Sequence, residues 1–153
     1  MKKIRLGVLG TGAFAEACHV PGLQSHPDAE VVVLCGRNLA RTRAMAERLG
    51  VPEFSLDYEQ VCARTDIDAI TIATPNVAHA IQSKAAFAAG KHVFCEKPLA
   101  MNSRESAELD GESRRYQVSV FHDLEPICSL IVLFDFLQMG GCDMPANHVI
   151  VME

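Results

Sequence analysis

Short apolar runs alternate with amphipathic stretches over most of the chain. The runs that fit buried parallel strands are Ile4–Leu9, Glu30–Cys35, Val51–Leu56, Ala69–Ala73 and His92–Cys95. The stretches between them that fit helices are residues 13–23, 38–49, 58–63 and 77–89. Alternation of strand and helix at this spacing is typical of βαβ units. We therefore predict an α/β fold with a doubly wound parallel sheet, whose strands end along one common edge where ligands bind.

Particular residues set the expected limits of these helices. Asn38 and Asp57 precede two of the helices and are expected to cap them with their side-chain oxygens. Pro21 is expected to mark a kink or the end of the first helix. Ser103 is expected to cap a last helix, which begins well and then fails at Asp110–Gly111.

Composition and charge exclude several classes of function. The net charge of −5 does not favour nucleic acid or an anionic membrane as a partner. The longest apolar run, Ile127–Phe134, is much shorter than the roughly twenty residues that span a membrane. Glycines soon interrupt the apolar stretch after the basic N-terminus, so no signal peptide is expected. We expect no metal, because no partner at metal-ligand spacing exists for His19, His26, His92, His122 or His148.

The cysteines indicate a reducing compartment. None of them forms a Cys-x-x-Cys pair, and Cys35 and Cys95 lie inside apolar runs that fit buried strands. We therefore expect free thiols that act as small core residues in a cytoplasmic protein. The six positions are 18, 35, 62, 95, 128 and 142.

A glycine-rich loop follows the first strand. Residues 10–15 fit the pattern G-x-G-x-x-A between a strand and a helix, which is the context in which this pattern binds a dinucleotide. Gly10 permits the tight turn, Gly12 leaves room for a diphosphate, and Ala15 lets the helix pack closely on the strand. The helix N-terminus then favours the phosphates. The residues expected to bind the cofactor here are Gly10, Thr11, Gly12, Ala13 and Phe14. An ordinary strand–helix turn rich in small residues is the alternative.

The end of the second strand predicts which dinucleotide binds. Many such domains place a carboxylate here to bind the adenosine ribose, whereas this chain has Arg37 and Asn38. A carboxylate would repel a 2′-phosphate, and an arginine would attract it. We therefore expect Arg37 and Asn38 to contact the cofactor and NADP to be preferred, with NAD possible as a cofactor. The alternative is a solvated arginine at the start of a helix.

Two later loops carry a resemblance to a known family. Ala73–His79 is similar to the A-T-P-N-x-x-H segment of the Gfo/Idh/MocA oxidoreductases, the family of glucose–fructose oxidoreductase and inositol dehydrogenase. Cys95–Ala100 resembles their E-K-P-L-A segment. Both segments stand in the order and at the distance from the glycine loop that the family shows, so the resemblance covers about two-thirds of the chain. It implies an NAD(P)-binding Rossmann fold.

The resemblance also implies roles for individual residues. The first segment lies along the nicotinamide half of the cofactor in the family, which implies cofactor contact for Thr74, Pro75, Asn76 and His79. The second segment implies that Lys97 lies close to the substrate and contacts the cofactor near its nicotinamide ring. It also implies that Lys97 is catalytic, as a cation that orients the substrate or relays a proton. It also implies that Glu96 lies beside the ribose. A lysine near the reacting carbon would stabilise negative charge on a carbonyl oxygen.

The chain departs from the family in its last part. Members of the family continue into a second domain that carries substrate specificity, and we expect the similarity here to end after Leu109. We therefore divide the chain into a dinucleotide-binding Rossmann domain, residues 1–109, and a short atypical tail, residues 110–153, which is not a full substrate domain. In this tail, Val118–Phe121 could form a strand. The apolar residues between 127 and 136 would need cover, so we expect a homodimer through this segment.

Two functions remain open on these grounds, and a third possibility is a structural fragment that no longer binds a nucleotide. The first is an NAD(P)-dependent oxidoreductase of the Gfo/Idh/MocA type, which transfers hydride between the nicotinamide and a sugar, polyol or related carbonyl compound. The alternative is a truncated, non-catalytic module that binds a dinucleotide without turnover. The missing second domain favours the alternative, since it would supply most of the wall that excludes water and positions the substrate.

Overall fold

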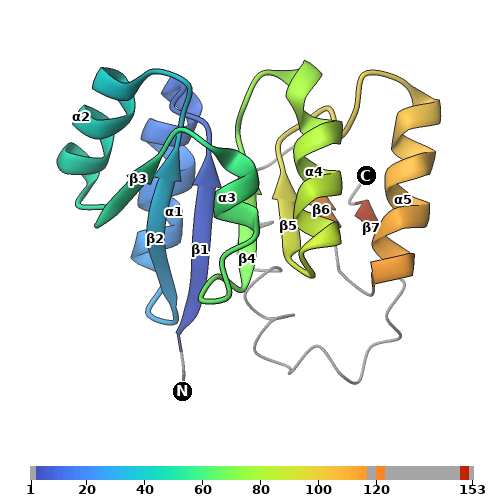
Figure 1. Cartoon of the computed structure of the whole chain (residues 1–153), viewed down its shortest axis with the longest axis horizontal. Coiled ribbons are helices and arrows are strands. Elements are labelled where there is room, and N and C mark those ends of the chain that lie inside the picture. Colours follow the sequence, from blue (N-terminus) through green and yellow to red (C-terminus); the bar gives the residue numbers. More distant parts are fainter. Residues whose placement is uncertain (1–2, 117–119, 123–148, 152–153) are drawn as a thin grey trace.

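A single parallel sheet forms the centre of the molecule. The computed structural model describes residues 3–116, 120–122 and 149–151. Within them, the strand order is β3-β2-β1-β4-β5-β6-β7, and all neighbouring strands run parallel (Figure 1). The strands are β1 (Ile4–Leu9), β2 (Ala29–Cys35), β3 (Glu53–Ser55), β4 (Ala69–Ile72), β5 (His92–Cys95), β6 (Val120–His122) and β7 (Val149–Val151). The first six follow the Rossmann order, so the predicted doubly wound sheet is confirmed.

Helices cover both faces of this sheet. Figure 1 shows α3 and α4 in front of the sheet and α1 behind it. The helical elements are a π-helical turn η1 (Ala15–His19), α1 (Val20–Ser25), α2 (Leu39–Leu49), α3 (Tyr58–Cys62), a 3-10 turn η2 (Asn76–Ala78), α4 (His79–Ala88) and α5 (Ser103–Tyr116). No helix in the described ranges has the length and apolar character that crossing a membrane requires.

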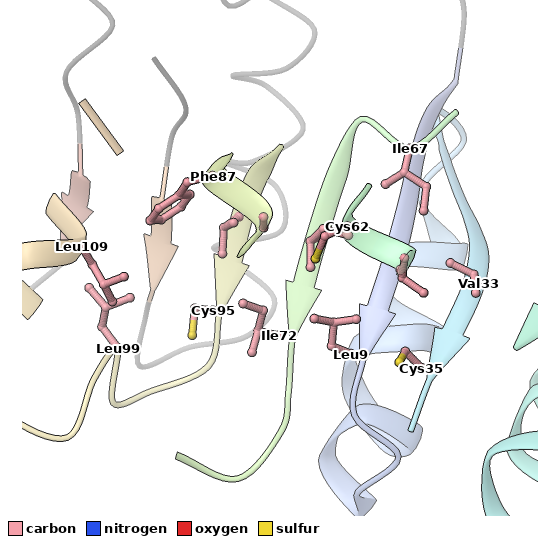
Figure 2. Close-up of a cluster of buried hydrophobic side chains, with 14 of the residues drawn as sticks. Leu9, Val33, Cys35, Cys62, Ile67, Ile72, Phe87, Cys95, Leu99 and Leu109 are labelled. Carbon is pink, nitrogen blue, oxygen red and sulfur yellow. The ribbon is translucent and has the colours of Figure 1, made fainter. Parts of the chain in front are cut away.

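The sheet therefore has a separate hydrophobic core on each face. Successive strand side chains point to opposite faces, so Val8 belongs to one core and Leu9 to the other. The core under η1, α1 and α2 includes Leu6, Val8, Leu23, Leu34 and Met45. The core under α3, α4 and α5 includes Leu9, Ile72, Phe87, Cys95 and Leu109, which Figure 2 shows together with Cys35 and Cys62.

The buried thiols behave as small core residues, as the sequence predicts. Cys35, Cys62 and Cys95 are free and buried. Burial raises the pKa of the Cys35 thiol to about 11 and that of Cys95 to about 12, so both stay protonated near neutral pH. Cys18 is also free, and positions 128 and 142 lie outside the described residues.

The predicted caps of two helices are confirmed. The Oδ1 atom of Asn38 accepts a hydrogen bond from the backbone N–H of Arg41 at 2.9 Å, and Asp57 accepts one from Gln60 at 3.1 Å. Pro21 does not end the first helical stretch, because it lies in the first turn of α1, where its missing N–H is harmless. The stretch instead changes from π to α geometry just before it and continues to Ser25.

The expectation for the last helix was wrong in two respects. The cap is Asn102, whose Oδ1 accepts from the backbone N–H of Glu105 at 2.9 Å, and Ser103 is the first helical residue. The helix also does not fail at Asp110–Gly111 but runs on to Tyr116. A glycine inside a helix costs only about 1 kcal/mol, and burial of Leu109 in the core can offset that cost.

The end of the chain is described only in part. Strand β6 lies close to the strand expected at Val118–Phe121, and β7, which the sequence did not predict, extends the sheet beyond it. The apolar residues between 127 and 136, on which the expected homodimer rests, lie outside the described residues.

Candidate functional site

A cavity lies where the strand order reverses. Strands β2 and β4 flank β1 on opposite sides, and connections leave in opposite directions at this point of the sheet. The cavity has a volume of about 480 Å³ and opens at the carboxyl ends of these strands. The sequence-predicted residues on its wall are Gly10, Thr11, Gly12, Ala13, Phe14, Arg37, Asn38, Thr74 and Pro75. Segments far apart in the sequence thus meet around one space.

The two glycines of the loop have different physical roles. Gly10 has φ 123°, and a Cβ there would lie 2.2 Å from the carbonyl oxygen of Ala73, so the fold itself requires glycine. A Cβ on Gly12 would meet nothing within 4 Å. The space at Gly12 is therefore open to a ligand, which fits the close approach of a diphosphate to the backbone.

Two arginines line the cavity on the side of β2 and α2. Arg37 and Arg41 are both exposed and both line it. Among the described residues, neither guanidinium has a hydrogen bond or ion pair, whereas Arg43, which lies on α2 together with Arg41, pairs with Glu47. Sequence reasoning missed Arg41. A cation in the first turn of a helix opposes the helix dipole, and that unfavourable placement was a signal that could have found it.

Apolar side chains complete the wall, and sequence reasoning missed these as well. Leu56 comes from the β3–α3 connection, Tyr58 is the first residue of α3, and Val77 comes from η2. Val77 is 73% exposed and Leu56 is 49% exposed. Exposed apolar groups beside a cavity with a few polar groups are typical of ligand sites.

Polar contacts below the cavity fix the loop after β4. The hydroxyl of Thr74 donates to Oε1 of Gln82 at 2.6 Å, and both residues line the cavity. The side chain of His79, which is expected to contact the cofactor, is fully buried and does not line the cavity. Its Nδ1 lies 2.7 Å from the carbonyl oxygen of Pro98, and its Nε2 lies 2.8 Å from that of Thr74. The ring therefore joins the loop after β4 to the loop after β5.

The loop after β5 carries the remaining predicted residues. Oε1 of Glu96 lies 2.8 Å from Nε2 of His19, which is fully buried, although the pair lacks the angle of a directed hydrogen bond. Oε2 of Glu96 accepts from the backbone N–H of Lys97 at 3.3 Å. The Lys97 side chain is exposed and has no ion pair in the described part of the chain. Asn76, Glu96 and Lys97 are not on the wall of the cavity itself.

This arrangement has the chemistry of a dinucleotide site. It offers an open glycine cradle, a helix N-terminus, two cations without internal partners, and a lysine near the end of the neighbouring strand. The charges suit phosphates, and the apolar wall suits the faces of planar rings.

Comparison with known proteins supports this interpretation. Residues 4–124 match the Gfo/Idh/MocA model, which describes an oxidoreductase family with an NAD-binding Rossmann fold. The match continues past Leu109, where the sequence had suggested that the similarity ends, and it covers α5 and β6.

Individual relatives agree with the family model. An uncharacterized oxidoreductase of Rhizobium meliloti is 37% identical over 144 residues, which are 92% of this chain and 42% of that protein. A D-xylose 1-dehydrogenase (NADP(+)) of Haloferax volcanii is 37% identical over 67% of this chain and 31% of its own length. The chain thus spans well under half of the length of these relatives.

Solved structures show the same fold. A 3-ketoreductase from Actinomadura kijaniata, in complex with NADP and TDP-benzene, superposes with a TM-score of 0.76 at 29% identity. The superposition covers 91% of this chain and 43% of that one.

Proposed function

The chain belongs to the Gfo/Idh/MocA oxidoreductase family, and from this premise we propose that it binds NADP in the cavity at the carboxyl edge of the sheet. We propose further that it serves hydride transfer between the nicotinamide and a sugar, polyol or related carbonyl compound. The observation that carries the proposal is the cavity that joins the open cradle at Gly12 to two arginines without internal partners.

The residues of this chain divide the work of holding the cofactor. Backbone N–H groups near Thr11 and Gly12 bind the diphosphate, since a helix N-terminus favours negative charge. Arg37 and Arg41 bind the 2′-phosphate, because a guanidinium forms strong charge-assisted hydrogen bonds with phosphate oxygens. Thr74 and Pro75 lie on the opposite wall and bound the nicotinamide half. The relatives that use NADP support this choice of cofactor.

Lys97 is the residue that we propose for catalysis. The bound nicotinamide supplies or accepts the hydride. Lys97 orients the carbonyl or hydroxyl group of the substrate and stabilises the negative charge that develops on its oxygen. Its exposed side chain and its position after β5, next to β4 in the sheet, suit this role.

Cofactor titration followed by turnover assays tests the proposal. We expect NADPH fluorescence to report tighter binding than NADH, and oxidation of some member of a panel of sugars and polyols to produce NADPH. Lys97→Ala should abolish turnover and leave the affinity for NADP unchanged. Binding with no turnover would support the dinucleotide-binding module in place of the enzyme, and absence of binding would refute both.

We also propose a homodimer and a cytoplasmic location. The apolar residues between 127 and 136 motivate the dimer, and the free thiols of the described cysteines suit a reducing compartment. Light scattering at micromolar concentration tests the dimer, and a monomer would count against it.

A further inference from the structure

The turn that carries Lys97 is held on both sides by buried histidines from different parts of the fold. Glu96, which precedes Lys97, contacts His19 at the end of η1. Pro98, which follows Lys97, contacts His79 at the start of α4. Both histidine side chains are fully buried, so neither is placed to touch a substrate. Resting on the function proposed above, we propose that His19 and His79 are positioning residues for Lys97.

His79 fixes the turn relative to the cofactor cavity. Its ring connects the carbonyl oxygen of Pro98 to that of Thr74, at 2.7 and 2.8 Å. Thr74 lines the cavity and is itself tied to Gln82 through its hydroxyl. A carbonyl oxygen can only accept, and a neutral imidazole carries one N–H. A neutral ring therefore donates one of the two contacts, as its tautomer decides, and only a doubly protonated ring donates both. The ring therefore sets the spacing between a cavity wall and the residue next to Lys97.

His19 fixes the same turn relative to the glycine loop. Its ring packs edge-on against Phe14, with centroids 5.2 Å apart, and against Phe94, with centroids 5.5 Å apart. Phe14 lines the cavity, and Phe94 belongs to β5. Between these rings, Nε2 of His19 lies 2.8 Å from the carboxylate of Glu96. The orientation of His19 is thus set by aromatic packing, and it sets the position of Glu96 in turn.

The fixed positions of Glu96 and Pro98 restrict where the side chain of Lys97 can reach. The Lys97 ammonium has no ion pair in the ranges that the structure describes, so only the backbone of its turn determines its place. A displacement of about 1 Å at a reacting centre can lower the rate by roughly 100-fold. Residues that hold the supporting loop therefore matter for turnover although they touch neither cofactor nor substrate.

A crossed set of amide variants tests this inference. The amide nitrogen of asparagine lies near the place of ring Nδ1, and that of glutamine lies near the place of Nε2. His79 contacts the carbonyl oxygen of Pro98 through Nδ1, and His19 contacts the carboxylate of Glu96 through Nε2, at 2.8 Å but without the angle of a directed hydrogen bond. We therefore expect His19→Gln to retain kcat within about threefold. His79→Asn keeps the contact to Pro98 and loses the contact to Thr74, so it should retain more kcat than His79→Gln. We expect His79→Gln and His19→Asn to lose roughly 10- to 100-fold in kcat, with the Kd for NADP changed by less than about twofold.

A measurement without cofactor separates this inference from the proposed function. In the full chain, backbone 15N order parameters at Glu96 and Lys97 should be near 0.85 in the wild type and should fall below about 0.6 in His79→Gln and His19→Asn. The inference is overturned if asparagine and glutamine act alike at each histidine, or if both order parameters and kcat stay at wild-type values. Failure of the wild type to bind NADP would refute the proposed function. The order parameters would still test whether His19 and His79 hold the turn of Lys97.

If a variant does not fold, the order parameters of the wild-type protein test whether the turn of Lys97 is held in place. Order parameters at Glu96 and Lys97 that equal those of β5 would support a held turn. Values below about 0.6 would overturn the inference, because a turn that moves on the nanosecond timescale cannot position Lys97.

Discussion

Arginine and lysine lie at both ends of the strands: at the amino edge, where the strands begin, and at the carboxyl edge, where they end. Among the described residues, arginines at the amino edge have partners within the protein, whereas Arg37, Arg41 and Lys97 at the carboxyl edge have none. Arg5, near the start of β1, pairs with Glu30 at 3.1 Å and with Asp66 at 2.9 Å. Arg64 shares Asp66, at 2.8 Å, and adds Glu53 at 2.7 Å. These ion pairs form a connected network at the amino edge, in which Asp66 links Arg5 to Arg64.

The carboxyl edge has the opposite character. Within the described residues, the side chains of Arg37, Arg41 and Lys97 form no hydrogen bond or ion pair, and the first two line the cavity. Cations without internal partners are available to a ligand, whereas paired cations would have to give up their partners to bind one. The difference teaches that charges at the amino ends of the strands contribute to stability, whereas charges at the carboxyl ends are available for binding. Substitutions at the two ends can test this division.

The largest effect should come from Gly10, which lies at the carboxyl edge but is required by the fold. Gly10→Ala places a Cβ 2.2 Å from the carbonyl oxygen of Ala73 at a φ of 123°, so we expect a loss of about 3 kcal/mol or more in the free energy of unfolding. Gly12→Ala is the matched control, since its Cβ meets nothing within 4 Å. It should keep its stability within about 0.5 kcal/mol and weaken NADP binding at least tenfold. Urea unfolding and NADPH titration measure both quantities, and equal stability of the two variants would contradict the assignment.

The buried lysine of the amino edge should give the next largest effect. Nζ of Lys91 donates to the carbonyl oxygens of Arg64 at 2.6 Å and Ile67 at 2.7 Å. Lys91→Met leaves two acceptors without a donor, so stability should fall by about 3 kcal/mol, and the affinity of the folded protein for NADP should not change. The control is Lys84→Met, which removes only exposed ion pairs and should cost at most about 1 kcal/mol. A weaker cofactor affinity in Lys91→Met would show that the two edges are coupled.

The arginines of the carboxyl edge should show the reverse pattern. Arg37→Ala and Arg41→Ala should each weaken NADP binding by roughly 10- to 30-fold, because each removes a charge-assisted contact worth about 1.5–2 kcal/mol. NAD binding and thermal stability should hardly change. Arg43→Ala is the matched control on the same helix, since Arg43 pairs with Glu47 and should not affect either cofactor. Titration with both nucleotides checks this, and an equal loss for NAD would argue against a 2′-phosphate site.

The smallest effect should be the pH dependence of the amino-edge network. Hydrogen bonds from Arg64 hold the pKa of the Asp66 carboxyl well below its usual range. The unfolded pKa is about 3.9, so the stabilisation is fully present above that pH and is lost as the pH falls through the lower folded value. At pH 7, Asp66→Asn should cost about 0.5–1 kcal/mol, as expected for an exposed network. Urea unfolding at neutral and acidic pH should show this gap shrinking in acid, and a constant gap would refute the explanation.

Local sequence patterns were sufficient to predict the role of a residue that acts on its near neighbours in the chain. Asn38 and Asp57 cap helices through atoms three residues away, and the glycine loop depends on the backbone around Gly10. The end of the last helix was predicted too early, because the prediction considered only the low helix propensity of Asp110–Gly111. The burial of Leu109 in the core favours continuation of the helix. Arg41 was missed because its role depends on facing a cavity formed by other segments.

The order of apolar runs and turns along the chain predicted the parallel sheet, because strand periodicity and alternation with helices are visible in the sequence. It also predicted the glycine cradle at Gly12 and the lysine after β5, because each lies in a short loop next to a strand. Only the tertiary structure decided which charges find partners. It also placed His19 and His79 beneath the turn of Lys97, since those contacts join residues that folding alone brings together.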